Sequence, residues 1–191
     1  MCGIVGYVGS DSVLPVLLGG LSRLEYRGYD SAGVAFIDRG EIAIKKKKGR
    51  IKNLEQALAD DGLLTRSGIH IGIGHTRWAT HGAPSDENSH PHLSADGRIA
   101  VVHNGIIENY LELKRFLIEK GFEFQSETDT EVVAHLLEHH YRTSCEGDIL
   151  AAVRKTLADL EGSYALGVLC ADPPDQFIAA RKASPALLEP M

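Results

Sequence analysis

The residue with the most distinctive chemistry is a cysteine at the second position of the chain. Removal of Met1 would leave Cys2 with both a thiol and an α-amino group. The reference pKa of an α-amino group is about 7.7–8.0 and that of a thiol about 8.5, so a neutral amine near pH 7 can accept the thiol proton. Such a pair needs no catalytic histidine elsewhere. The alternative is that Cys2 is a small buried hydrophobic residue.

Two polar segments that follow apolar runs offer groups for binding a negative charge. Arg77 stands at the end of an expected strand, where its planar guanidinium could bind a carboxylate or could be an exposed structural arginine. Asn104 and Gly105 follow another apolar run. An Asn amide and a glycine N–H can converge on the oxyanion of an acyl transfer, but Asn-Gly is also the commonest hairpin turn signal. Both interpretations stay open on the residues alone.

A third polar segment opens an expected helix. In the segment 126–131, Ser, Thr and Asp are typical capping residues. Asp129 would have a function only if it did something besides capping, such as binding an ammonium group. His75 and His81 lie six residues apart, but no carboxylate or cysteine completes a ligand set, so no metal site is expected.

The elements that must position these residues alternate between strands and helices. A hairpin is expected around Arg39-Gly40, and a loop rich in His, Pro, Asn and Ser at 76–96. Strands grouped at both ends of the chain indicate α+β layers with mainly antiparallel sheet. The strands expected from apolar runs are 2–8, 32–38, 41–48, 69–75, 99–104, 122–125, 164–170 and 176–181. The helices expected from apolar periodicity are 14–24, 51–59, 111–121, 130–141 and 149–160.

Composition and charge exclude several classes of protein. The chain has 191 residues, 43% hydrophobic and 24% charged, which is ordinary for one globular domain. A net charge of −6 argues against a nucleic-acid partner, and the basic run 45–48 is interpreted as a solvated strand end. Three cysteines without a CxxC pair do not form a disulfide framework and suit a reducing cytoplasm. No signal peptide or membrane-spanning run is present, so no membrane association is expected.

Taken together and in order, these segments resemble the class II glutamine amidotransferases. The resemblance rests on 1–6, 24–33, 75–82, 103–109 and 126–131, and it runs from residue 1 to about Pro185. Within this class, 77–82 and 88–92 resemble the N-terminal glutaminase domain of the isomerising glutamine–fructose-6-phosphate aminotransferases. A glutaminase domain of another class II enzyme, such as an amidophosphoribosyltransferase, is the nearest alternative.

The resemblance implies a fold, a reaction and a role for individual residues. The fold would be the four-layer αββα sandwich of N-terminal-nucleophile hydrolases. Cys2 would attack the side-chain amide of free L-glutamine to form a γ-glutamyl thioester, with the oxyanion held by Asn104 and the Gly105 N–H. No metal or organic cofactor is implied. Substrate binding falls to Arg77 for the carboxylate, Asp129 for the ammonium group, and Thr80, His81 and Trp78 around the pocket, with Arg27 supporting them from behind.

The resemblance also implies segments that are not in this chain. Members of the family continue into two sugar-isomerase domains, which bind fructose 6-phosphate. We therefore expect residues 1–191 to be one type-2 glutamine amidotransferase domain, incomplete at its C-terminus and without those domains. The full-length enzyme is expected to be a homo-oligomer, a dimer. The alternative outside enzymology is a catalytically inactive glutamine-binding fragment.

Overall fold

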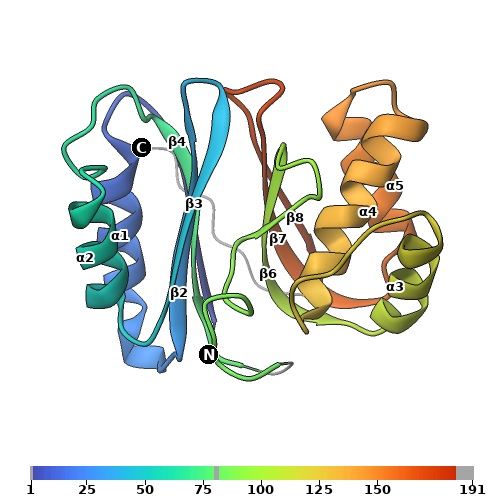
Figure 1. Cartoon of the computed structure of the whole chain (residues 1–191), viewed down its shortest axis with the longest axis horizontal. Helices are drawn as coiled ribbons and strands as arrows, with labels where there is room; N and C mark the ends of the chain where they lie inside the picture. Colours follow the sequence, from blue (N-terminus) through green and yellow to red (C-terminus); the bar gives the residue numbers. More distant parts are fainter. Residues whose placement is uncertain (1, 80–81, 184–191) are drawn as a thin grey trace.

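The computed structural model describes residues 2–79 and 82–183, which form two antiparallel four-stranded sheets facing one another (Figure 1). The first sheet has the order β1-β4-β2-β3 and the second the order β5-β6-β7-β8. In the first sheet the strands are β1 (Gly3–Val8), β2 (Ser31–Asp38), β3 (Glu41–Lys48) and β4 (Ile71–Arg77). In the second they are β5 (His92–Leu93), β6 (Ile99–Ile107), β7 (Gly162–Cys170) and β8 (Phe177–Lys182).

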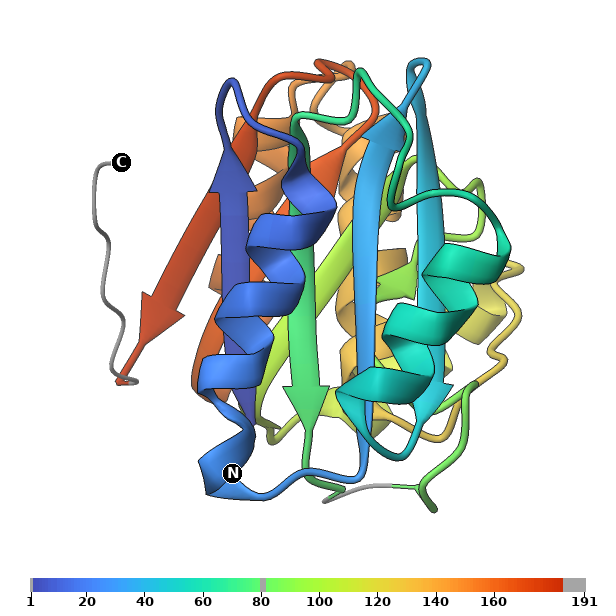
Figure 2. The same ribbon diagram turned by 90° about the vertical axis from the view of Figure 1, so that its left-hand side faces the viewer.

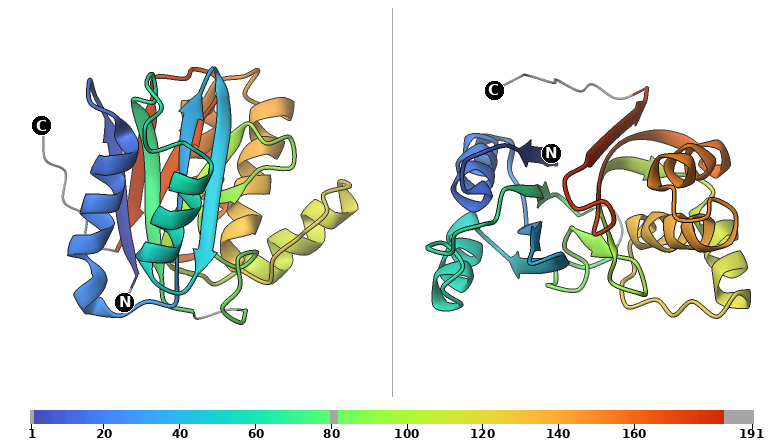
Figure 3. Two further views of the ribbon diagram at one scale, coloured as in Figure 1. Left: turned by 60° about the vertical axis from the view of Figure 1, so that its left-hand side comes forward. Right: turned by 90° about the horizontal axis from the view of Figure 1, so that it is seen from above.

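Helices cover the outer faces of both sheets, which gives the expected αββα order of layers. The views from the side and from above place α1 (Val13–Arg23) and α2 (Ile51–Asp60) outside the first sheet (Figures 2 and 3). Outside the second sheet lie α3 (Tyr110–Glu119), α4 (Asp129–Thr143) and α5 (Ile149–Asp159). A short 3-10 helix, Glu25–Arg27, joins α1 to β2.

The layer between the sheets is apolar along most of its length and polar at one end. Ile71 and Ile73 of β4 belong to the apolar cluster that fills this layer, together with residues of β2 and β6. Successive side chains of a strand alternate between its two faces. His75 and Arg77 therefore continue the same face as Ile71 and Ile73, but with polar groups. The alternation thus places His75 and Arg77 at one end of the space between the sheets.

The structure corrects three expectations about local structure. β6 runs on to Ile107, so Asn104 and Gly105 pair with Ala165 and Tyr164 inside a sheet, and the turn interpretation is wrong. The expected strand at 122–125 is also wrong, because its aromatic residues pack against the core under α4 and pair with no described strand. The expected loop 76–96 is shorter, since β4 includes Arg77 and β5 lies within the loop.

One glycine of β6 has a backbone conformation that side chains rarely permit. Gly105 has φ +127°, and a Cβ atom there would lie 2.1 Å from the Ser163 carbonyl oxygen. Only glycine avoids both the strain and the clash. The residue after Asn104 is therefore glycine for a structural reason that does not depend on any turn.

None of the described helices is both long enough and apolar enough to span a lipid bilayer.

Two neighbouring glycines of α1 provide a paired test of the packing between helix and sheet. A Cβ at Gly19 would meet nothing within 4 Å, whereas a Cβ at Gly20 would lie 2.9 Å from Val5 Cγ1. We expect Gly19→Ala to raise the free energy of unfolding by about 0.5–1 kcal/mol, because alanine loses less backbone entropy in a helix. Gly20→Ala gains the same propensity but must displace Val5, so its stability should fall below that of Gly19→Ala. Urea unfolding measures both, and equal changes would contradict the described packing.

Candidate active site

The thiol of Cys2 lies against the end of β4. Antiparallel pairing sets Gly3 opposite Thr76 and Ile4 opposite His75, so Cys2 comes opposite Arg77. The Trp78 backbone N–H donates to Cys2 Sγ at 3.2 Å, and the thiol lies 3.6 Å from the Trp78 carbonyl oxygen. Strand register therefore brings the candidate nucleophile beside the candidate carboxylate-binding arginine.

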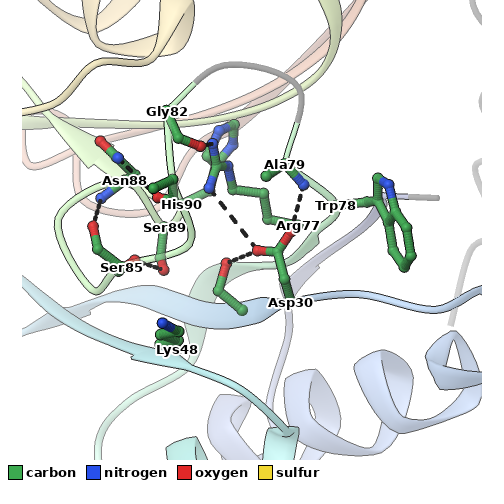
Figure 4. Close-up of polar contacts among 12 residues, drawn as sticks. Asp30, Lys48, Arg77, Trp78, Ala79, Gly82, Ser85, Asn88, Ser89 and His90 are labelled. Atoms are coloured by element: carbon green, nitrogen blue, oxygen red, sulfur yellow. Dashed lines mark hydrogen bonds and ion pairs between the residues drawn. The ribbon is translucent and has the colours of Figure 1, made fainter.

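Arg77 is a buried cation held by two segments of the chain. Only 4% of its surface is exposed, which excludes the exposed structural arginine considered above. Its Nη2 donates to the Gly82 carbonyl oxygen at 3.2 Å, and Nη1 lies 3.9 Å from Asp30 Oδ1 (Figure 4). Asp30 also accepts hydrogen bonds from the Ala79 N–H and the Ser31 hydroxyl. The sequence reasoning assigned Asp30 no role, although it directly precedes β2.

Trp78 and Arg27 lie at the rim of this region. The Trp78 side chain is 54% exposed and points away from Arg77 (Figure 4). Its ring packs on Gly28, where a Cβ would lie 3.0 Å from Cζ3 of the indole. Arg27 is in the 3-10 helix, and its Nε donates to the Tyr26 hydroxyl at 3.2 Å. Thr80 and His81 lie outside the described residues.

The side chain of Asn104, on β6, contacts a histidine of the first sheet. His75 is completely buried, and its Nε2 lies 2.8 Å from Asn104 Oδ1 and 3.0 Å from the His103 carbonyl oxygen. Burial lowers the pKa of His75 to about 3, although its hydrogen bond to Asn104 acts in the opposite direction. The imidazole is therefore neutral at physiological pH. The sequence reasoning considered His75 only as a metal ligand and missed this contact.

His75 belongs to a cluster of four buried histidines that also includes His90, His92 and His103. The rings of His75 and His90 stack with centroids 4.2 Å apart, and the His103 N–H donates to His90 Nδ1 at 3.3 Å. Burial lowers the pKa values of His90 and His92 well below 6.5, and the charge of Arg77 acts in the same direction. Within 2–79 and 82–183 no group of histidine, cysteine, aspartate or glutamate is arranged to hold a metal ion.

Asp129 does not cap its helix. Its Oδ2 accepts a hydrogen bond from the Ile107 N–H of β6 at 3.0 Å, and it is 5% exposed. The N-cap residue Thr128 makes no capping hydrogen bond with its side chain. Glu131 accepts the N–H groups of Gln125 and Ser126 instead. Burial opposes ionisation of Glu131, but these bonds and that from His135 lower its pKa to about 2.

A hydroxyl connects Asp129 to the histidine cluster. Thr130 Oγ1 lies 2.9 Å from His103 Nδ1, 3.3 Å from His90 Nε2 and 3.5 Å from Asp129 Oδ1. His90 in turn stacks on His75, which contacts Asn104. Polar contacts therefore extend from Asn104, between the sheets, to the start of α4.

The loop between β4 and β5 is anchored to both halves of the molecule. Asp86 accepts a hydrogen bond from the Lys48 backbone N–H at 2.7 Å and pairs with Lys47 Nζ at 2.8 Å. Asn88 Oδ1 accepts from the Glu127 N–H at 2.9 Å, just before α4. The basic run of β3 therefore contributes to holding this loop, in addition to being a strand end.

Two facing antiparallel sheets, covered by helices and carrying a thiol at the start of the first strand, define the N-terminal-nucleophile class of fold. A family model described as "Glutamine amidotransferase domain" matches residues 75–184, which is more than half of the chain. The chain therefore belongs to the glutamine amidotransferase domain family.

Relatives in sequence share one name. The glutamine–fructose-6-phosphate aminotransferase (isomerizing) of Caldanaerobacter subterraneus subsp. tengcongensis is 62% identical over 188 residues, and that of Clostridium tetani is 54% identical. Each match covers 98% of this chain but only 30% of the relative. The chain thus spans about a third of the length of these relatives.

Solved structures share the fold. The glutamine phosphoribosylpyrophosphate amidotransferase from B. subtilis superimposes with a TM-score of 0.72 at 30% identity, over 90% of this chain and 35% of that one. A glutamine aminotransferase class-II domain protein from Silicibacter pomeroyi has a TM-score of 0.59 at 17% identity, over 98% and 79% of the two chains. The second likeness concerns the fold alone.

The buried histidines should make the fold sensitive to mild acid. Below about pH 6.5 the unfolded chain takes up protons on His75, His90 and His92, while the folded chain does not. The free energy of unfolding should therefore decrease as the pH is lowered below about 6.5, by about 1.4 kcal/mol per pH unit for each histidine. Urea unfolding between about pH 7 and pH 5 would show a falling midpoint at constant slope.

The titration of Glu131 does not contribute to the change in stability between about pH 7 and pH 5. Because its folded pKa is lowered, its contribution to stability is lost only as the pH falls below about 4.5, outside the window. A midpoint that stays constant from about pH 7 to pH 5 would contradict a neutral histidine cluster.

Proposed function

We propose that this chain hydrolyses free L-glutamine to glutamate and ammonia through a γ-glutamyl thioester on Cys2. The observation that carries the proposal is the placement of Cys2 at the end of β4, with its thiol on the Trp78 N–H and its strand position opposite Arg77. His75, two residues before Arg77 and on the same face of β4, contacts Asn104 of the other sheet. A nucleophile, a buried cation and an amide thus meet at one end of the two sheets.

The nucleophile needs a base, and we assign this role to its own amino group. After removal of Met1, the Cys2 amine takes the thiol proton as Sγ attacks the amide carbon of glutamine. The same amine then gives the proton to the amide nitrogen as the C–N bond breaks. Ammonia departs, and the γ-glutamyl thioester remains on Cys2. Water hydrolyses the thioester to glutamate and restores the thiol. The neutral His75, with its pKa near 3, cannot act as a base that is charged and discharged around pH 7.

The oxyanion of each tetrahedral intermediate requires donors that are in place beforehand. We assign this role to the Asn104 side-chain amide and the Gly105 N–H. The φ of +127° at Gly105 interrupts the regular geometry of β6 just after Asn104. The positive φ of Gly105 and the buried partner of Asn104 are both consistent with a preorganised site.

The two ends of the substrate call for opposite charges. Arg77 would bind the α-carboxylate, and Asp129 the α-ammonium group, so that only a free amino acid satisfies both. Thr80, His81 and Trp78 would surround the substrate. Arg27 would contact these residues and not the substrate itself. Asp30, 3.9 Å from Arg77, would keep the guanidinium in place when no substrate is bound.

The alkylating glutamine mimic 6-diazo-5-oxo-norleucine tests the nucleophile. We expect intact mass spectrometry to show loss of Met1 and addition of one label, because only the mature Cys2 carries its own base. Cys2→Ala should take no label. Cys145→Ala, which removes another half-buried cysteine, should still take it. Processed chain that stays unlabelled would contradict the proposal for this chain.

We further propose that the ammonia serves the conversion of fructose 6-phosphate to glucosamine 6-phosphate in a longer, dimeric and cytoplasmic protein. The identities of 62% and 54% to aminotransferases of that name support this acceptor over phosphoribosylpyrophosphate, whose amidotransferase is 30% identical. The isomerase part of such an enzyme, outside the 30% of the relatives that this chain matches, would bind the sugar phosphate.

Mixing the chain with the isomerase part of a relative tests the acceptor. Glutamine and fructose 6-phosphate should then yield glucosamine 6-phosphate, detected by mass spectrometry, and Cys2→Ala should abolish it. Phosphoribosylpyrophosphate with its own transferase part serves as the control. Glutamine hydrolysis with amination of the second acceptor alone would exclude the assigned one.

A further inference from the structure

The hydrogen-bonding state of His75 is fixed by a backbone carbonyl. Its Nε2 contacts the His103 carbonyl oxygen at 3.0 Å, and a carbonyl can only accept a hydrogen bond. Nε2 must therefore carry the proton, whichever way the neighbouring amide is turned. Nδ1 is then unprotonated, which agrees with its burial without a hydrogen-bond partner among the described residues.

The proton on Nε2 determines the orientation of Asn104. The same Nε2 lies 2.8 Å from the Asn104 side chain, so the atom facing it must be the acceptor Oδ1. The Nδ2 amino group therefore faces away from His75. An Asn amide reversed about its last bond would present an acceptor to the oxyanion, and its carbonyl would repel the developing negative charge.

The imidazole itself is held rigidly. His75 lies in the middle of the first sheet, paired with Ile4 of β1 and Gly33 of β2. Its ring stacks on His90 at 4.2 Å with 22° between the planes. His90 approaches so closely that a Cβ at Gly33 would lie 2.2 Å from its carbonyl oxygen. The donor that orients Asn104 thus has little freedom to turn.

We propose that His75 is a positioning residue that holds the Asn104 amide with its Nδ2 donor directed to the oxyanion. The inference rests on the proposed function, since it presumes that Asn104 stabilises the oxyanion. His75 touches neither substrate nor thiol in this role. It acts through Asn104 alone, and this makes the role separable from a general contribution to folding.

A double-mutant cycle tests the coupling, with kcat and KM for glutamine hydrolysis as the readout. Asn104→Ala should lower kcat by about 10²–10³-fold with little change in KM. His75→Leu should lower kcat by about 10–100-fold, again with little change in KM, because it frees the amide to turn. In the Asn104→Ala background, His75→Leu should cost nothing further, since no amide remains to be oriented.

Two further variants separate positioning from packing. His75→Gln can donate from an amide nitrogen near the position of Nε2 and should keep most of kcat. His135→Leu removes another buried histidine, which lies on α4 and donates to the Glu123 carbonyl oxygen, and should leave kcat unchanged. If His75→Leu does not fold, nitrogen NMR of the unmodified chain still tests the proposal, because His75 must appear as the Nε2–H tautomer.

The outcomes distinguish the two proposals. Equal losses from His75→Leu with and without Asn104, a change in KM alone, or an Nδ1–H tautomer would overturn the positioning role. Full turnover of Asn104→Ala would instead overturn the oxyanion assignment in the proposed function. Non-additive losses with rescue by His75→Gln would support the positioning role.

Discussion

The hydrogen bonds from His75 to Asn104 and to the His103 carbonyl oxygen join the two sheets at one end of an interface that is apolar along most of its length. Polar groups buried between sheets must find partners, because a buried donor or acceptor without one is costly. Along most of the interface the problem does not arise, since Ile71, Ile73 and Val102 fill the space. At the end where Cys2 lies the side chains are polar, and His75, His103 and Arg77 form hydrogen bonds with neighbouring residues. The relative placement of the two sheets is therefore set where the chemistry is proposed to occur.

Much of the secondary structure could be predicted from the sequence, because amphipathic periodicity is a local property. The helices, seven of the expected strands and the αββα layers agree with the structure over the described residues. The strand expected at 122–125 failed because Phe122 and Phe124 gain burial by packing under α4 without pairing. Asn104 and Gly105 look locally like a turn, and only their pairing with β7, some sixty residues later, places them in a strand.

The site residues divide in the same way. The resemblance named the candidates whose residue type suggests chemistry, such as Cys2, Arg77 and Asp129, and their assigned roles remain predictions. It gave no role to Asp30 or His75, whose importance lies in their partners. His75 contacts a residue 29 positions away, and Asp30 contacts one 49 positions away. No pattern in one sequence reveals such pairs, because long-range contacts depend on the packing of the whole fold.

The anchoring of the loop through Asp86 has a consequence for the behaviour of the protein in concentrated solution. β3 is an edge strand of the first sheet, and exposed backbone groups on an edge can template pairing with another chain. Asp86 occupies the outward N–H of Lys48 at this edge. The loop that contacts Arg77 through Gly82 therefore also caps an edge that could otherwise recruit a foreign strand. Replacing Asp86 would therefore free the Lys48 N–H at this edge for pairing with another chain.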